Sequence, residues 1–462
     1  MSHAIKETTG STRVEPAAEP GVDTSVGQVL VSKVPRRALW MLASMTLLGI
    51  LSQFFRSSNG VIAPNLMEDL SLNAEEIGVV SGSFFYIFTI LQIPIGVLLD
   101  RYGGRFVISS MMILAMAGSL VFAVAGSLFG LTAGRLLIGI GCAGIMVGSL
   151  VICRRWFPPE RYTSAMAVLF AFSNAGSLAA AGPLAFAAAA WGWRGAFVGL
   201  AGVAALLTLL FYLVVRDAPP GHPYHRRTPD TLAATIKGLR EVWALRDVAY
   251  ILPMVAVGYA SVITVLGLWG GPYFYEVHGL GEVERGNLLS LMAIAMIAGT
   301  LFYGPLDRRF NTRRGVVTWG ALATAAMLVV LVLIPKPSLW LASVLLSLFC
   351  FLGAYSLVVM AHGLSLFPER LAGRGVTTLN VGLMGGAAVL QTLTGQLIGW
   401  FPDRHGDAGD LAYRLLFLLL AALTLAALVL YRRVRDVRPV RVVPSRSGTG
   451  SQARTGAASQ AD

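Results

Sequence analysis

The chain alternates between long apolar stretches and short polar connections over nearly its whole length. Twelve of these stretches reach the roughly 20 residues that one bilayer crossing needs. The pattern predicts an all-α polytopic membrane protein with twelve transmembrane helices. These helices are expected at approximately 38–63, 77–99, 106–126, 128–152, 162–187, 195–215, 248–271, 286–306, 315–334, 338–362, 374–400 and 411–431.

A polar hairpin made of Gly, then Asp-Arg, then further arginine occurs twice in the chain. It reads GVLLDRYGGRF at 96–106 and GPLDRRFNTRR at 304–314, and each copy follows an apolar stretch. Pro64 and Pro272, which follow the first helix of each set of six, repeat at an offset of 208 positions. Six crossings separate the copies, so both run in the same direction. The sequence therefore predicts two parallel halves, an arrangement typical of transporters that rock one half against the other.

The repeat also predicts the domain organisation. We expect six-helix halves at 37–215 and 248–435, joined by a cytoplasmic linker at 216–247. Within this linker, TLAATIKGLREVWALRD is predicted to form a short amphipathic helix on the cytoplasmic surface. The segments 1–36 and 436–462 are polar and are predicted to be disordered cytoplasmic tails.

Composition excludes a soluble globular protein, because 55% of the residues are hydrophobic and only 13% are charged. The net charge of +12 reflects Lys and Arg concentrated on one set of connections, which sets both termini in the cytoplasm. These basic residues are scattered over loop ends, so we expect no nucleic-acid partner. No signal-peptide cleavage site follows the first apolar stretch. We expect a multi-pass protein of a bacterial inner membrane.

The chain has no pattern that indicates an enzyme. Its cysteines, Cys142, Cys153 and Cys350, lie in or at the ends of apolar stretches without metal-ligand spacing. There is no nucleophile–base pair, phosphate loop or metal cluster at usable spacing. We therefore expect no catalytic residue, no metal and no cofactor.

At the two hairpins the chain resembles the major facilitator superfamily. GVLLDRYGGRF is similar to its loop signature, with Gly104 standing where a basic residue is usual. Arg135 to Gly139 is similar to the superfamily's Arg-x-x-x-Gly element, and Gly182-Pro183 partly matches its exporter motif. The resemblance implies the superfamily fold and transport by alternating access.

The same resemblance implies a conformational gate at the hairpins. Its candidate residues are Gly96, Asp100, Arg101, Arg105, Asp307 and Arg308. We expect Asp100 to pair with Arg101 or Arg105, or to face the positive N-terminus of a neighbouring helix. In the alternative interpretation, these residues only anchor the topology of the chain.

Two clearly charged residues, Arg56 and Arg135, fall inside the predicted membrane spans, whereas the carboxylates map to tails, loops or span ends. An arginine in hydrocarbon costs at least about 2.5–3.5 kcal/mol and persists when it faces a cavity with a partner. Gln53 and Asn59 lie three positions on either side of Arg56, which predicts a polar stripe. Alternatively, Arg56 reaches the outer interface, and Arg135 donates to carbonyls of neighbouring helices.

A narrower resemblance concerns the position of Arg56, eight residues before Pro64. Organophosphate/phosphate antiporters of the superfamily carry such an arginine in both halves, but here Thr264 stands eight residues before Pro272. Organic-anion symporters place carboxylates near their two arginines, where this chain has Phe55 and Cys142. The physical inference is a smaller or singly charged anion, held by one guanidinium fork, and a carboxylate fits.

The leading hypothesis is therefore a secondary active transporter of a small anion, coupled to protons or run by exchange. Its substrate would bind Arg56, Gln53, Asn59, Tyr86, Arg135, Tyr259, Thr264 and Asn380. A drug or metabolite efflux permease is the first alternative, and a transporter-like ligand sensor is the second. The expected partners are the small-molecule substrate, a co-transported proton in the coupled case and the lipid bilayer, and we expect a monomer.

Overall fold

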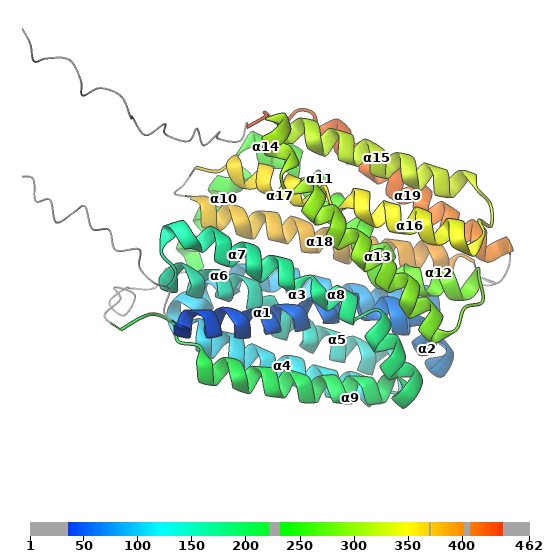
Figure 1. The fold of residues 1–462 in the computed structure, drawn as a ribbon, viewed down its shortest axis with the longest axis horizontal. Helices are drawn as coiled ribbons and strands as arrows, with labels where there is room; N and C mark the ends of the chain where they lie inside the picture. The colour runs from blue at the N-terminus through cyan, green and yellow to red at the C-terminus, as the bar shows by residue number, and fades with distance from the viewer. Residues whose placement is uncertain (1–35, 221–231, 369–370, 402–406, 438–462) are drawn as a thin grey trace, which may run out of the picture.

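The computed structural model describes residues 36–220, 232–368, 371–401 and 407–437, and its regular elements are all helices. Figure 1 shows two groups of long helices lying side by side. The first group comprises α1 (Arg36–Ser57), α2 (Asn59–Leu70), α3 (Ala74–Tyr102), α4 (Gly104–Ala123), α5 (Leu128–Ala143), α6 (Ile145–Trp156), α7 (Pro159–Ser173), α8 (Ala175–Ala179) and α9 (Gly182–Val214). The linker contains α10 (Leu232–Trp243). The second group comprises α11 (Arg246–Thr264), the π-helix η3 (Val265–Trp269), α12 (Gly270–Glu276), α13 (Glu282–Tyr303), α14 (Leu306–Phe310), α15 (Arg313–Leu333), α16 (Leu339–Gly353), α17 (Ser356–Ser365), α18 (Ala372–Gly399) and α19 (Asp407–Tyr431).

Eleven described stretches are long and apolar enough to cross a membrane, and one of them makes two crossings. That stretch, Ser164–Val214, has 51 residues, more than twice the roughly 20 that a crossing needs. It bends at Gly192, whose φ of 69° favours glycine. Trp193, just after the bend, contacts Asp69 at the end of α2, whereas Asp217, just after α9, contacts the start of α4. The chain therefore turns back at Gly192, and the predicted all-α protein with twelve transmembrane helices is confirmed.

Side chains cap several helices at the points where the sequence provides a polar residue. The Asn73 side chain accepts from the Glu76 N–H at 2.9 Å, and the Glu76 carboxylate accepts from the Asn73 N–H at 2.8 Å. This capping box starts α3. Thr312 Oγ1 accepts from the Gly315 N–H at 2.9 Å and starts α15. Such caps satisfy N–H groups that have no partner within the helix.

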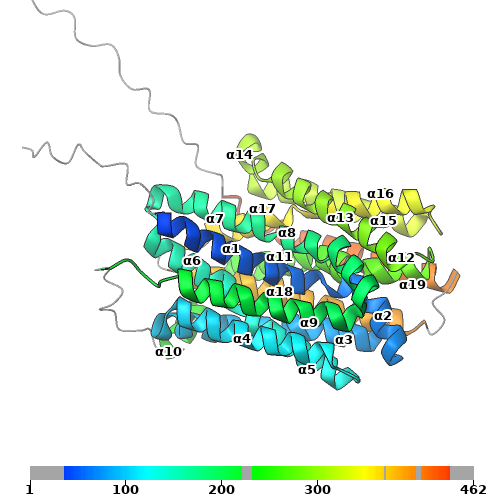
Figure 2. The same cartoon turned by 60° about the horizontal axis from the view of Figure 1, so that its bottom comes forward.

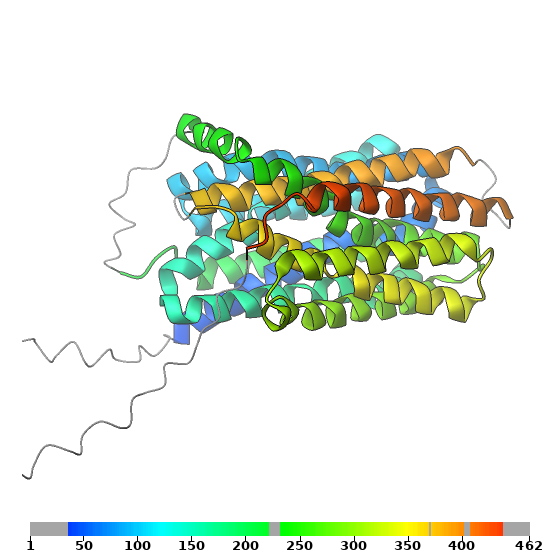
Figure 3. The ribbon, with the colours of Figure 1, turned by 90° about the horizontal axis from the view of Figure 1, so that it is seen from above.

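The two ends of the helical bundle carry different connections. We call one end the linker face, because it holds the start of α1, the end of α9, α10 and the residues after α19. The other end, the far face, holds α2 and α12, which lie next to each other (Figure 2). Seen from above, α10 lies at the same end as the start of α1 (Figure 3). Both halves of the chain therefore begin at the linker face.

The predicted linker helix is present as α10, and it packs against α18. Trp243 Nε1 donates to Thr378 Oγ1 at 3.2 Å, and Gly238 lies against the Arg374 side chain. The same helix also contacts α3. It therefore touches both halves at the linker face, while its position on a membrane surface stays a prediction. The predicted tails lie outside the described residues, except for Arg36, Asp436 and Val437.

Irregular points in the helices repeat with the same period as the sequence. The first crossing is interrupted at Ser58, between α1 and α2, and the corresponding Leu266 lies inside η3. A second interruption, at Gly144 between α5 and α6, corresponds to Ala354 between α16 and α17. Ser58, Gly144 and Ala354 keep right-handed helical φ and ψ, so these points bend the crossings without ending them.

Glycines allow the two halves to approach closely at the far face. A Cβ on Gly78 of α3 would lie 2.9 Å from the Cα of Gly395 on α18, and the reverse distance is also 2.9 Å. A Cβ on Gly271 of α12 would overlap the carbonyl of Gly60 on α2. Small residues permit this kind of backbone contact between membrane helices. The interface between the halves is therefore tightly packed at the far face.

Candidate substrate-binding site

The interruption of the first transmembrane helix is held by Arg135 of α5. This side chain is fully buried, and its Nη1 donates to the Phe55 carbonyl at 2.8 Å. The Ser58 hydroxyl donates to the same carbonyl at 3.1 Å. Nε and Nη2 of Arg135 are buried without a hydrogen-bond partner. One donor therefore supports the helix break, as the structural interpretation of Arg135 expects, while the other two are available for a ligand.

Arg56 lies beside the same break, in the last turn of α1. Its side chain is 9% exposed, and its Nε is buried without a partner. The guanidinium carbon lies 4.6 Å from the centre of the Phe88 ring. A cation over an aromatic face gains about 0.5–2 kcal/mol, which is less than the cost of burying an arginine in a membrane. Burial argues against the interpretation in which Arg56 reaches the interface, and the energy deficit favours an anionic partner.

Two phenylalanines of α3 bring the arginines together. Phe84 lies under Arg135, with 5.1 Å between the guanidinium carbon and the ring centre, and Phe88 lies under Arg56. The two rings are one helical turn apart, with centres separated by 5.9 Å. Cys142 of α5 lies within electrostatic reach of both arginines. The first half therefore forms a positively charged site with aromatic walls.

The second half meets the first helix through η3, which directly follows Thr264. Thr264 is fully buried and its hydroxyl has no partner, although helical threonines elsewhere, such as Thr324, donate to the carbonyl four residues earlier. The Arg56 carbonyl lies 3.4 Å from where a Cβ on Gly267 would be, one turn after Thr264. Thr264 also directly precedes η3, and π-helical turns are frequent at functional sites. The structure therefore places Gly267 of η3, one turn after Thr264, against the backbone of Arg56.

Three other predicted binding residues are also buried in part or in full. The Tyr259 hydroxyl and Asn59 Oδ1 are buried without partners. Asn380 of α18 donates to Gln92 Oε1 at 3.5 Å, and Gln92 lies one turn after Phe88. Asn380 therefore links the second half to the helix that carries both phenylalanines.

Two predicted binding residues are directed elsewhere. Gln53 Nε2 donates to Asn174 Oδ1 at 3.2 Å, so this amide joins α1 to the break between α7 and α8. Tyr86 is 42% exposed and shares a face of α3 with Val79 and Ile90, which are also exposed. The Gln53 amide is therefore engaged within the first half, and Tyr86 lies on an exposed face of α3.

The first hairpin is anchored by an aspartate that the sequence analysis did not select. Asp217, three residues after α9, accepts from the Arg105 N–H at 2.9 Å. Arg105 Nε donates to the Tyr212 carbonyl at 2.8 Å, and Arg101 lies over Tyr102 at 5.3 Å. These contacts do not include Asp100, and its pairing with Arg101 or Arg105 stays a prediction. Gly96 has open space beside it, within 4 Å of where a Cβ would be.

The second hairpin has the same kind of anchor. Asp436, after α19, accepts from Thr312 Oγ1 at 2.5 Å and from the N–H groups of Arg313 and Arg314 at 3.2 and 3.1 Å. Burial raises the pKa of Asp436, but these hydrogen bonds outweigh it, so the pKa is lowered overall. Asp307 pairs with Arg313 at 3.2 Å.

Asp436 is the first residue of the segment predicted to be a disordered tail, and it contacts Thr312 of the hairpin. Arg308 is exposed. The signal that could have identified both anchors is a short repeat: the dipeptides Arg216-Asp217 and Arg435-Asp436 each follow the last helix of a half. Each half therefore ties its hairpin to the end of its own sixth helix.

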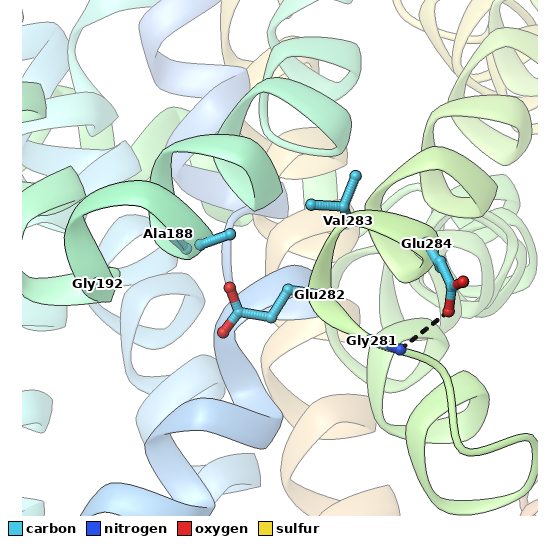
Figure 4. A pocket seen from close by; sticks show the side chains of 7 residues that line it. Ala188, Gly192, Gly281, Glu282, Val283 and Glu284 are labelled. Atoms are coloured by element: carbon cyan, nitrogen blue, oxygen red, sulfur yellow. Dashed lines mark hydrogen bonds between the residues drawn. The ribbon is translucent and has the colours of Figure 1, made fainter.

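A polar cluster joins the halves at the far face. Asn65 of α2 contacts the Glu282 carboxylate, and Arg285 Nη2 donates to Asn65 Oδ1 at 3.3 Å. Beside this cluster lies a surface hollow of about 530 Å³ between α9 and α13. Figure 4 shows Glu282 directed between these helices and Glu284 bonded back to Gly281. A second hollow, of about 390 Å³, lies between α4 and α9. Both hollows are lined by residues other than the arginines.

Comparisons with known proteins agree with this architecture. A family model described as the Major Facilitator Superfamily matches residues 45–389 and 272–459. The nitrate/nitrite transporter NrtP of Picosynechococcus is 26% identical over 290 residues, which are 53% of this chain and 52% of that protein. The match therefore spans about half of that relative's length. A protein of Cupriavidus necator named "Probable sulfoacetate transporter SauU" is 24% identical over 411 residues, covering 84% of this chain and 92% of its own.

Solved structures share the fold at low identity. A bacterial homolog of the human lysosomal transporter Spinster, in an inward-facing and unoccupied conformation, has a TM-score of 0.68 and 20% identity. It covers 87% of this chain and 99% of its own. A D-xylose-proton symporter has a TM-score of 0.69 and 16% identity, covering 86% and 98%. These relatives are transporters rather than enzymes. Since the family model spans most of the described chain, the protein belongs to the Major Facilitator Superfamily of membrane transporters.

Proposed function

We propose that the protein is a secondary active transporter that carries a small organic anion, bearing a carboxylate or similar oxyanion, by alternating access. The observation that carries the proposal is the pair of buried guanidiniums at the break of the first helix. Arg56 and Arg135 retain unpartnered N–H groups there. Guanidinium groups bind planar oxyanions through paired hydrogen bonds, and such bonds are strong where water is excluded.

The surroundings favour a small anion with one charged group. One guanidinium nitrogen of Arg135 already donates to the Phe55 carbonyl. Fewer donors therefore remain for a solute that carries a second phosphate-like group. Thr264, Tyr259 and Asn59 would supply neutral hydrogen bonds to the rest of the solute. Phe84 and Phe88 would face its apolar part.

The relatives support an anion as cargo. Two of them are named for nitrate/nitrite and for sulfoacetate, which are all oxyanions. The first match covers only about half of its relative, and identities stay at 24–26%, so the particular anion is a proposal for this chain. The shared feature is a delocalised negative charge on two or three oxygens.

The proposed orientation places the linker face in the cytoplasm of a bacterium, with both termini on that side. The glycine contacts at the far face then close the external side, and the anion would enter or leave through the linker face. The hairpins anchored by Asp217 and Asp436 would act as hinged units at the cytoplasmic gate. Alternating access follows if the glycine contacts open while the hairpins close.

An efflux function is the second candidate, because one relative is named as an efflux pump. This protein of Mycolicibacterium smegmatis is 28% identical over 289 residues, covering 60% of this chain and 64% of its own. Cationic drugs would meet the two buried arginines in the membrane interior. An efflux substrate would therefore be neutral or anionic if it used this site.

The test is uptake into liposomes that contain the purified full-length protein. Radiolabelled nitrate, acetate, sulfoacetate and phosphate would be offered with and without the same anion inside. We expect saturable uptake of at least one carboxylate or sulfonate and at least about a 100-fold loss in Arg56→Ala, equal to about 2.7 kcal/mol. Arg194→Ala, which removes an arginine paired with Asp69 at the far face, is the control. Undiminished uptake in Arg56→Ala, or transport of cationic dyes alone, would overturn the proposal.

A further inference from the structure

We propose that a groove between α4 and α9, at the linker face, binds one anionic phospholipid of the surrounding bilayer. The two helices lie side by side at the edge of the bundle (Figure 1). The groove between them is the hollow of about 390 Å³ described above. This inference concerns the outer surface of the protein, and its test needs no knowledge of the transported solute.

Both helices that form the groove present apolar side chains to the bilayer. Phe106, Ile113 and Leu209 line the groove and are 54–58% exposed. Leu206 and Leu213 extend the same exposed surface along α9. A continuous apolar surface of this kind on a membrane protein is covered by lipid tails. A groove in this surface is therefore suited to an acyl chain.

A cation is fixed at the linker-face rim of the groove. The guanidinium carbon of Arg105 lies 4.0 Å from the centre of the Tyr212 ring, and Tyr212 lines the groove. Arg105 Nε donates to the Tyr212 carbonyl, and the two Nη groups have no hydrogen-bond partner among the described residues. Arg101 lies over Tyr102, whose ring centre is 6.4 Å from that of Phe106. Basic pockets between transmembrane helices bind the head groups of anionic lipids.

The surroundings of the rim are positively charged even when their carboxylates are counted. Asp217 accepts from the Arg105 N–H at 2.9 Å, and Trp156 at the end of α6 donates to the Arg216 carbonyl at 2.9 Å. The segments that meet here hold five arginines and two aspartates, in 100–106, 154–156 and 212–217. Their net charge is therefore +3, which complements a phosphate.

The polarity of α4 along the groove follows the order of the groups in a phospholipid. Arg105 lies at the rim, Ser109 follows one turn deeper, and Ile113 and Met116 line the groove beyond it. At 1.5 Å per residue, Ser109 lies about 6 Å below Arg105. The ester groups of a phospholipid lie just inside its phosphate, and its acyl chains follow. A lipid with its phosphate at Arg105 would therefore place an ester group beside Ser109.

The hydroxyl of Ser109 supports this arrangement. Ser109 lines the groove, yet its hydroxyl is buried without a hydrogen-bond partner. Helical serines elsewhere, such as Ser173, donate to the carbonyl four residues earlier. An unsatisfied buried hydroxyl is unfavourable, and the ester carbonyl of a lipid would accept from it.

The hollow at the far face provides a contrast within the same protein. Its charged lining residues are Glu282 and Glu284, and no arginine lines it. Carboxylates repel a phosphate, so the far-face hollow should not select an anionic lipid. We expect selection only at the groove between α4 and α9.

The experiment measures lipid binding to the purified full-length protein by native mass spectrometry. Delipidated protein in detergent is titrated with phosphatidylglycerol or with phosphatidylcholine of the same acyl chains. We expect the first phosphatidylglycerol to bind at least about 5-fold more tightly, equal to about 1 kcal/mol. It should also raise the unfolding temperature more than phosphatidylcholine does. Equal affinities for the two lipids would overturn the proposal.

A pair of arginine variants separates the rim from the overall charge of the protein. Arg105→Gln should remove the preference for phosphatidylglycerol, because the phosphate loses its cation. Arg194→Gln is the matched control, since Arg194 also lies over an aromatic ring, 4.2 Å from Trp193, but at the far face. It should keep the preference. Equal losses in both variants would contradict a site at the groove.

A second pair of variants tests the groove itself. Ala205→Phe adds a large apolar side chain to its lining without changing a charge. Phosphatidylglycerol binding should weaken at least about 5-fold. Val198→Phe, at an exposed position of α9 outside the groove, should bind as the wild type does. If Ala205→Phe does not fold, Ser109→Leu fills the groove from α4 instead. Wild-type affinity in the filled variant would overturn the proposal.

Discussion

At the break of its first helix, the N-terminal half holds Arg56 over an aromatic ring, whereas the C-terminal half holds Thr264 before a π-helical turn. The two positions correspond through the internal repeat, and both helices are irregular there. The two halves therefore share the irregular backbone but differ in the side chain at this position, Arg56 in one and Thr264 in the other. This difference indicates that the N-terminal half would bind the charge of the solute and the C-terminal half its neutral groups.

The same comparison applies to the ends of the bundle. At the far face, glycine backbones of the two halves touch directly. At the linker face, each half ties its own hairpin to its own sixth helix, through Asp217 or Asp436. Contacts across the interface must break during transport, whereas contacts within one half can move as a rigid unit. The far-face glycines are therefore the better candidates for a closing surface, and the aspartates for hinges.

The largest effect on transport is expected from replacing the two arginines. The two variants should differ in stability, because Arg56 is proposed only to bind the anion whereas Arg135 also supports the helix. Arg56→Ala removes a side chain whose described contact is an aromatic ring, so transport should fall at least about 100-fold with little loss of stability. Arg135→Ala should abolish transport as well. It also leaves the Phe55 carbonyl with one donor fewer, and removing a charged hydrogen bond costs about 1.5–3 kcal/mol. Thermal unfolding in detergent, followed by fluorescence, measures the difference.

Arg135→Lys is the matched control, because it keeps a charge but offers fewer hydrogen bonds. It should recover part of the stability and little of the transport. Equal destabilisation by Arg56→Ala and Arg135→Ala would contradict the proposal that only Arg135 has a structural role besides binding.

The second effect concerns the far-face contact. Gly271→Val places a side chain where the Gly60 carbonyl lies, so the two halves can no longer close there. Transport should fall about 10-fold, equal to about 1.4 kcal/mol. A cysteine introduced at Ser81, which is buried, should become accessible to a membrane-impermeant thiol reagent. Gly202→Val is the control, since its site has no atom within 4 Å of the added Cβ. Unchanged labelling in Gly271→Val would contradict the closing role.

A smaller effect is expected from the neutral half of the site. Thr264→Val preserves the size of the side chain and removes a buried hydroxyl that has no protein partner. Stability should be unchanged or slightly raised, because an unsatisfied buried polar group is lost. The apparent affinity for the anion should weaken about 3- to 10-fold, equal to about 0.7–1.4 kcal/mol. Saturation curves of uptake give this value, and a loss of stability with unchanged affinity would assign Thr264 to packing.

The smallest effect compares the two hairpin anchors. Asp217→Asn and Asp436→Asn should each cost about 1 kcal/mol, because a carboxylate that accepts backbone N–H groups is replaced by a weaker acceptor. The pKa of Asp436 is lowered in the folded protein. Its contribution is therefore present above the unfolded pKa of about 3.9 and is lost as pH falls through the folded value. Unfolding temperatures of wild type and Asp436→Asn should differ at neutral pH and converge as pH falls below the folded pKa of Asp436.

Local sequence was sufficient for the helices, the crossings and the repeat. Apolar stretches of membrane length can only be helices or closed barrels in lipid, because every backbone polar group must be satisfied internally. The positions of Arg56 and Arg135 could also be identified from the sequence, since a charge inside an apolar stretch is visible without a structure. Even the absence of a second arginine, at Thr264, followed from aligning the two halves.

Side-chain partners were predicted less well. Gln53 was predicted from its place beside Arg56 in the sequence, and Tyr86 from its polarity within an apolar helix. In the fold, Gln53 donates to Asn174 and Tyr86 is 42% exposed. Arg105 of the first hairpin contacts Asp217, more than 100 positions away in the chain, and this partner was not predicted. Such pairings depend on which helix ends meet, and no local pattern contains that information.

The sequence by itself therefore determined the number of crossings, the two parallel halves and the presence of two arginines in the membrane, because each depends only on polarity along the chain. The tertiary structure decided that both arginines lie at one helix break, over adjacent rings of α3, and that Asp217 and Asp436 anchor the hairpins. These facts require helices distant in sequence to be placed side by side. Packing, and not polarity, brings charges from separate helices into one site.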